Sequence, residues 1–171
     1  MSANNIESNG KSAVNMGQQP AQAAPVAAVF SAAGPWSTGL CGCFEETSNC
    51  CVTCCCPCIT FGRNVEIIDQ GTTSCAQAGI IYYCLAHVGC ASCYSCTYRS
   101  KLRAYFNLSE DPCNDCLVHC FCLPCAVCQE YRELKNRGLD PSHGWIANVE
   151  RWNQLAVRTT APPTFEAGMY R

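Results

Sequence analysis

The chain has 171 residues, of which nineteen are cysteine, and its net charge is −2 at neutral pH. The length suggests one domain with tails, and the charge balance argues against nucleic-acid binding. Residues 1–38 carry no basic start followed by a sustained apolar run, so we expect no signal peptide and a reducing, cytosol-facing environment. Cysteine at this density in such an environment indicates metal or redox chemistry rather than structural disulfides.

The composition changes along the chain define three regions. Residues 1–35 are rich in Ala, Asn, Gln, Ser and Pro and cannot bury enough apolar surface to fold alone, which predicts a disordered N-terminal tail. A cysteine-rich folded domain is expected over residues 36–152. Residues 153–171, with two adjacent prolines among small residues, are interpreted as a flexible C-terminal tail.

Three apolar, cysteine-rich blocks lie inside the predicted domain, at residues 50–61, 75–98 and 113–128. The second block has no Asp, Glu, Lys or Arg, and basic residues follow it at once from Arg99. A bilayer core needs about 20 apolar residues in a helix, so we interpret this block as a membrane-spanning helix; a buried helix of a soluble domain is the alternative. The other two blocks are shorter and contain a proline each, which favours broken, re-entrant or interfacial helices, with a second span through 113–128 as a further option.

These patterns predict a mainly α fold: a small, cysteine-rich, membrane-associated helical domain with one or two hydrophobic helices and disordered tails. Residues 129–137, QEYRELKNR, are expected to form a charged, solvent-exposed helix that ends at Gly138. Glu133 and Arg137 are four residues apart and can support it as an ion pair. A gating or coupling role for Glu130 and Glu133 is the alternative.

A faint internal repeat relates the first and third blocks. A shift of 67 positions aligns CCPCITFGRNVEIIDQG with CLPCAVCQEYRELKNRG, so that Cys58 meets Cys125 and Gly71 meets Gly138. Each copy reads as a Pro-Cys turn, a helix and a glycine suited to a left-handed helix end. If the repeat is real, it suggests two similar half-sites.

Thiolates are soft ligands that suit zinc, cadmium and copper(I). The stretch CCVTCCCPC places Pro57 between Cys56 and Cys58, and the proline stops a helix running on, so both thiols can turn toward one point. We therefore interpret the stretch as a thiol-rich turn with Cys56 and Cys58 as metal ligands. The other cysteines have two alternative roles: they can pack as small hydrophobic residues, or they can be palmitoylated. Further closely spaced pairs are Cys51/Cys54, Cys55/Cys58, Cys93/Cys96, Cys113/Cys116 and Cys125/Cys128.

Two histidines lie among these cysteines. In a helix through the second block, Cys84, His87 and Cys90 share one face. In the third block Cys113, Cys116 and Cys120 share a face, with His119 beside it. Either histidine can equally be a hydrogen-bonded interior residue. No phosphate-binding glycine loop, nucleophile–base pair or HExxH helix is present, so we expect no enzyme.

Three segments of the chain resemble a known protein family. The segments WSTGLCGCFEETSNCCVTCCCPCITFGRNVEIIDQGTTSC, YSCTYRSKLRAYF and CNDCLVHCFCLPCAVCQEYRELKNRG closely resemble the placenta-specific 8 family, in its plant branch of cadmium resistance proteins and fruit-weight or cell number regulators. The resemblance covers residues 36–152. Its CCxxxxCPC signature falls on Cys50-Cys51 and Cys56-Pro57-Cys58, and this chain departs from it by the extra cysteines Cys54 and Cys55.

The resemblance implies a small plasma-membrane protein with one or two spans that self-associates. It implies a role in cadmium and zinc handling, or in restraining cell number and organ size. The candidate ligands for divalent zinc or cadmium ions combine the signature with one pair from the third block: Cys50, Cys51, Cys56, Cys58, Cys125 and Cys128. No further cofactor is expected.

Two functions follow as hypotheses. In the first, a homo-oligomeric membrane protein promotes metal efflux, with the thiolates of Cys56 and Cys58 capturing the ion. In the second, a membrane-anchored negative regulator of cell number acts through protein contacts. A passive thiol buffer is a third, simpler option.

Overall fold

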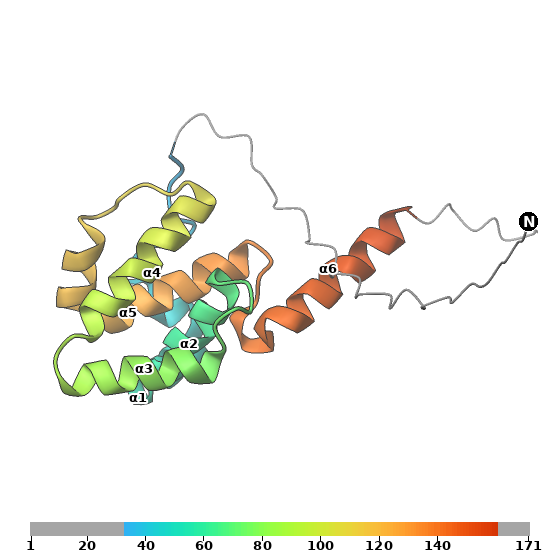
Figure 1. The fold of residues 1–171 in the computed structure, drawn as a ribbon. Helices are drawn as coiled ribbons and strands as arrows, with labels where there is room; N and C mark the ends of the chain where they lie inside the picture. The colour runs from blue at the N-terminus through green and yellow to red at the C-terminus, as the bar shows by residue number, and fades with distance from the viewer. Residues whose placement is uncertain (1–32, 161–171) are drawn as a thin grey trace, which may run out of the picture.

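The computed structural model describes residues 33–160, and the predicted mainly α fold is confirmed there (Figure 1). The one strand-like feature of these residues is a bridge between Gly34 and Leu108. Nearly all of the predicted N-terminal tail, and residues 161–171 of the predicted C-terminal tail, lie outside the described residues. The elements are η1 (Gly42–Glu46), α1 (Thr47–Cys55), α2 (Pro57–Ile68), α3 (Cys75–His87), α4 (Ala91–Phe106), α5 (Asp115–Asn136), η2 (Pro141–His143) and α6 (Gly144–Thr160).

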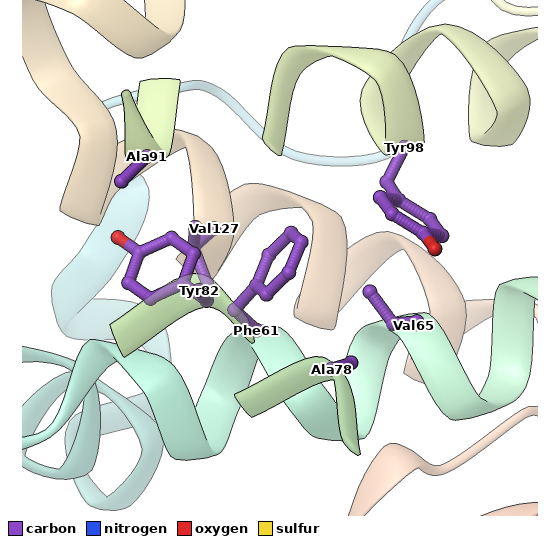
Figure 2. Packing of buried hydrophobic residues seen from close by; sticks show 7 residues of the cluster. All are labelled: Phe61, Val65, Ala78, Tyr82, Ala91, Tyr98 and Val127. Carbon is purple, nitrogen blue, oxygen red and sulfur yellow. The ribbon is translucent and has the colours of Figure 1, made fainter. Parts of the chain in front are cut away.

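Helix α2 lies at the centre, and its buried face forms the main core with α3, α4 and α5 (Figure 2). The fully buried ring of Phe61 lies 4.7 Å from that of Tyr82 on α3 and 5.6 Å from that of Tyr98 on α4, measured between centroids. Val65 and, from α5, Val127 complete the contact. Each such side chain contributes about 1.5–3 kcal/mol by leaving water, so this cluster fixes three helices around α2.

Helices α2 and α3 approach so closely that two glycines are needed at their crossing. A Cβ added at Gly62 would collide with the backbone carbonyl of Cys75. A Cβ added at Gly79 would lie 3.0 Å from the carbonyl oxygen of Cys58. Small residues at a helix crossing allow this kind of close backbone packing.

A single carboxylate positions the starts of two helices. Glu66 on α2 accepts a hydrogen bond from the backbone N–H of Cys75 at 3.1 Å and another from that of Trp145 at 3.0 Å. These N–H groups belong to the first turns of α3 and α6, which have no partner within their own helix. The carboxylate also complements the positive end of each helix dipole.

The predicted domain boundary between residues 152 and 153 falls inside a helix, because α6 continues to Thr160. Trp145 and Trp152 are seven residues apart and therefore share a face of α6. Their rings pack edge to face at 6.2 Å between centroids. Both rings cover a second core cluster, made of Ile67, Leu102, Leu134 and Leu139.

The second apolar block is not one helix, so the predicted continuous span over residues 75–98 is wrong. Helix α3 ends at His87 and α4 begins at Ala91. Gly89 takes a positive φ of 76°, and the N–H of Cys90 bonds to the carbonyl of Leu85 at 2.9 Å, which closes the end of α3. Within residues 33–160 no helix on its own has the length and apolar character to cross a bilayer; only Gly42–Cys55 and Pro57–Ile68 taken together do, across a bend of 113°.

A buried cation joins α4 to both halves of α5. Arg99 is fully buried; its Nε lies 3.3 Å from a carboxylate oxygen of Asp115, and its Nη1 lies 3.8 Å from one of Glu130. Its guanidinium also donates to the side-chain oxygen of Gln129 at 2.8 Å and lies 4.0 Å from the ring centre of Trp36. A charge removed from water in this way is tolerated only when its partners stay in place.

The charged stretch at residues 129–137 is mostly buried, so the predicted solvent-exposed helix is wrong over its first six residues. The reason is the segment 36–39, which lies against it. Ser37 donates from its N–H to Glu133 at 2.7 Å, and Arg132 donates to the carbonyl of Gly39 at 2.7 Å. The predicted pair between Glu133 and Arg137 is confirmed at 2.6 Å.

Replacing Gly62 by alanine tests the close crossing of α2 and α3. Alanine gains about 1 kcal/mol in helix propensity over glycine, whereas overpacking costs about 1–3 kcal/mol. Because the new Cβ meets backbone rather than a flexible side chain, we expect the overpacking cost to lie near the top of its range, so that Gly62→Ala loses about 2 kcal/mol of unfolding free energy in balance. Denaturant unfolding followed by circular dichroism measures this. Gly39→Ala, at an open position, is the control, and equal stability of both variants would contradict the crossing.

Removing the buried guanidinium should lower the free energy of unfolding far more than removing an exposed ammonium. We expect Arg99→Met to lose about 3–5 kcal/mol of unfolding free energy, because Glu130 stays buried without its arginine and Asp115 keeps only Arg103 as a cation. Lys101→Met breaks an exposed 2.9 Å pair with Asp69 and should cost less than about 1 kcal/mol. The same unfolding measurement compares them. A loss of similar size in both variants would show that the Arg99 network does not hold α4 to α5.

Candidate functional site

The cysteine-rich turn lies at a sharp break between two helices, as the sequence predicts. Cys56 has a non-helical backbone, with φ −142° and ψ 74°, which ends α1, and Pro57 is the first residue of α2. Proline is favoured there because its missing N–H would have no partner in the first turn. The break therefore presents the turn thiols, Cys56 and Cys58, at the start of α2.

The two turn thiols face different surroundings. Cys56 is exposed, while Cys58 is partly buried and lines an apolar groove of about 280 Å³ between the first turns of α2 and α3. Cys75 lines the same groove and interacts with Cys58. Burial raises the pKa of Cys75, and the nearby Glu66 carboxylate raises it further. An ion held at Cys58 would thus have Cys75 as a neighbouring thiol.

A second group of thiols, the inner thiol cluster, consists of Cys43, Cys50, Cys125 and Cys128. Cys43 of η1 hydrogen-bonds to Cys125 and lies near enough to Cys50 and Cys128 to add to the rise that burial causes in the pKa of each. Burial raises the pKa of Cys128 to about 11, with smaller contributions from Cys43 and Cys50 and an opposing hydrogen bond from Thr53. Burial also raises the pKa of Cys125, which hydrogen-bonds to Cys122 and Cys43. Cys125 and Cys128 therefore stay protonated near neutral pH unless a metal displaces the proton.

The kink in α5 places Cys125 much as the first break places Cys58. Cys122 is non-helical, with φ −144° and ψ 53°, and Pro124 follows inside the helix. In both copies of the repeat the helix after the Pro-Cys pair ends in a glycine of positive φ, 78° at Gly71 and 85° at Gly138. The predicted turn, helix and glycine of positive φ are present in each copy, but the left-handed end of α2 already begins at Gln70, whose φ is 53°. The surroundings differ, because Cys58 faces the groove and Cys125 faces Cys43.

The structure thus separates the six predicted ligands into more than one place. Cys50, Cys125 and Cys128 meet in the inner thiol cluster, Cys58 lies in the groove, and Cys51 and Cys56 are exposed. Among the described residues, no three His, Cys, Asp or Glu side chains converge closely enough to hold a metal ion. Cys43 and Cys75 are not among the six predicted ligands. The Cys-x-Cys spacing of residues 41–43 is the one signal that could have indicated the former.

The two histidines have different environments. His119 is fully buried, with one ring nitrogen 2.9 Å from Glu130 and the other 2.8 Å from the hydroxyl of Ser95, which confirms it as a hydrogen-bonded interior residue. His87 is exposed and packs edge to face on Tyr83, so the same interpretation is wrong there. The face predicted for Cys84, His87 and Cys90 is interrupted, because α3 ends at His87. Cys113 likewise precedes α5 rather than sharing a face with Cys116 and Cys120.

The fold and its thiols define a small, helical, cysteine-rich domain, and residues 36–133 match the model of the PLAC8 family. The chain belongs to this family, as its sequence motifs predict. It is 52% identical over 141 residues to Protein PLANT CADMIUM RESISTANCE 2 from Arabidopsis thaliana, which covers 82% of this chain and 93% of that protein. It is 55% identical over 139 residues to Cell number regulator 10 from Zea mays, covering 78% and 88%. No solved structure matches.

Alkylation rates should distinguish the buried from the exposed cysteines among the predicted ligands. At pH 8 we expect Cys128 to be alkylated at least about tenfold more slowly than Cys56, because it is buried and its raised pKa leaves little thiolate. Isotope-coded alkylation followed by peptide mass spectrometry measures both sites in one sample. The same reaction in denaturant is the control, where the two rates should converge. Equal rates in the folded protein would contradict the burial of Cys128.

Proposed function

We propose that this chain acts in heavy-metal homeostasis and resistance, as a homo-oligomeric plasma-membrane protein that promotes the efflux of cadmium or zinc. The observation that carries the proposal is the helix break at Cys56–Pro57, which holds the exposed thiol of Cys56 two residues from Cys58, a partly buried thiol that lines an apolar groove. Soft thiolates are the protein ligands that such ions prefer. The names of relatives such as Protein PLANT CADMIUM RESISTANCE 2 support the same class of ion.

The exposed face of α3 supports attachment to a membrane. Helix α3 contains no Asp, Glu, Lys or Arg, and its side chains Ile80, Ile81 and Tyr83 are exposed, as is Val88 just beyond its end. A helix that is apolar on all sides normally lies in a protein core or in a membrane. Only Ala78 and Tyr82 of α3 are buried against the rest of the chain. We therefore assign this α3 face to the lipid.

Ion transfer requires weak, exchangeable binding rather than a closed four-thiolate site. Cys56 would take the ion from solution, and Cys58 with Cys75 would receive it in the groove, so that two or three thiols share it at any time. Because the rest of the groove lining is apolar, the sulfurs would have to replace the ion's water shell there. Residues 33–160 supply a single bent apolar helix pair, which is too little to surround a path, so several copies would surround it together.

A second candidate is a membrane-anchored negative regulator of cell number that acts through protein contacts. The observation that favours it is the identity of about half with proteins named cell number regulators, including Cell number regulator 7 and Cell number regulator 10 of Zea mays. In that case the α3 face would anchor the chain and the turn thiols would be structural or lipidated. This regulator function would be distinguished by an effect on growth that does not need metal binding.

Cadmium content of metal-sensitive cells that express the chain tests the proposal. We expect wild type to lower cell cadmium and improve growth. Cys56→Ser combined with Cys58→Ser should abolish most of that reduction, because both soft ligands of the turn are lost. The double variant Cys90→Ser, Cys93→Ser removes two exposed thiols away from the turn and is the matched control. All variants are compared at equal abundance in the membrane fraction.

The alternatives give different results in the same cells. Higher cadmium with better growth would mean sequestration and would contradict efflux. If the control variant loses the cadmium reduction to the same extent, the turn thiols have no special role in it. No change of cadmium in any variant, with an effect on cell number that survives the turn mutations, would favour the regulator. A chain that remains monomeric in mild detergent would contradict the assembled path.

A further inference from the structure

A pair of thiols outside the turn and the inner cluster lies unusually close together. The sulfur of Cys96 on α4 is 3.0 Å from the sulfur of Cys116 on α5. Cys96 is buried, whereas Cys116 is exposed. We propose that Cys96 and Cys116 form a redox-modifiable dithiol, which a glutathione-type disulfide oxidises to an intramolecular disulfide between α4 and α5. This inference is independent of the proposed metal efflux.

The neighbouring ion pairs hold the two sulfurs in register. Asp115, the residue before Cys116, accepts hydrogen bonds from Ser100 and from Arg103, each at 2.7 Å. Ser100 lies one helical turn after Cys96 and therefore on the same face of α4. The carboxylate thus fixes the first turn of α5 against this face, and the sulfurs are brought together by contacts that do not involve sulfur.

The separation of the sulfurs favours a disulfide over a metal. Two thiolates bound to one tetrahedral zinc ion at about 2.3 Å lie about 3.8 Å apart, and a disulfide bond is about 2.0 Å long. At 3.0 Å the pair is already closer than a shared zinc ion would hold it. Neither thiol belongs to a group of three potential ligands among the described residues.

The exchange has two steps. In total, the protein dithiol and one glutathione disulfide become one protein disulfide and two glutathione thiols, so two electrons pass from the protein to glutathione. The Cys116 thiolate attacks one sulfur of glutathione disulfide, forming a mixed disulfide and releasing one glutathione thiolate. Cys96 then loses its proton and attacks the Cys116 sulfur, releasing the second glutathione thiolate. The two released thiolates take up the two protons lost by the cysteines. The protein dithiol is oxidised, and glutathione disulfide is reduced.

Exposure sets the order of the two steps. Glutathione disulfide can reach Cys116 at the surface, but it cannot reach Cys96. Burial also raises the pKa of Cys96 to about 12, and its hydrogen bond with Cys116 adds to this, so Cys96 is a poor first nucleophile. Once Cys116 carries glutathione, Cys96 needs no diffusion to reach it, because its sulfur already lies beside it.

Peptide mapping of the full chain after mild oxidation tests the pair. The protein is incubated with glutathione disulfide, its free thiols are blocked, and it is digested without reduction by chymotrypsin and Asp-N protease. Cleavage leaves Cys96 alone in SCTY (95–98) and Cys116 alone in DCL (115–117). We expect the linked peptides to be at least tenfold more abundant than any link between Cys116 and Cys93, the exposed neighbour on α4.

Single variants distinguish a built pair from random exchange. In Cys96→Ser, Cys116 should remain as a stable mixed disulfide with glutathione. In Cys116→Ser, whose changed side chain is exposed, Cys96 should stay reduced, and Cys93→Ser should form the link as wild type does. Circular dichroism confirms that each variant is folded. Mixed disulfide on Cys116 in wild type without the linked peptides, or equal linking through Cys93, would overturn the proposal.

Discussion

The buried guanidinium of Arg99 is the constraint on which the arrangement around α4 and α5 depends. A cation without water is stable only among fixed partners, and these come from separate parts of the chain. Asp115 precedes the kink of α5, Glu130 follows it, and Trp36 lies in the segment before η1. Because one side chain binds all three, the two halves of α5 and the N-terminal segment cannot move independently. This network therefore helps to position the cysteines on both halves of α5.

Cysteine serves more than one purpose in this fold, and burial decides which. Cys128 is packed in the interior, where a thiol behaves as a small hydrophobic residue. Cys56 is held at the surface by a helix break and remains available for chemistry. Cys58 and Cys75 lie between these extremes, in a groove formed because Gly62 and Gly79 let α2 and α3 approach closely. The same glycines therefore determine both the packing of the two helices and the environment of the candidate thiols.

The differences between the predicted and observed helices have physical reasons. The second apolar block reads as one span because composition over 24 residues averages out Gly89, yet that glycine's positive φ ends α3 and turns the chain into α4. The charged stretch in α5 reads as exposed because Glu133 and Arg132 usually face water. In this fold they are covered by residues 36–39, which lie more than 90 positions away in the sequence. No local pattern could reveal that partner.

The sequence by itself determined the features that depend on neighbouring residues: the helical class, the turn at Cys56–Pro57, the helix end at Gly138 and the family. Proline and glycine act on the backbone directly beside them, so their effects can be predicted without a fold. Only the tertiary structure decided which thiols meet, such as Cys96 with Cys116, and which charges are buried. Those outcomes depend on contacts between helices far apart in the chain, whose positions are set by the core around Phe61 and the network around Arg99.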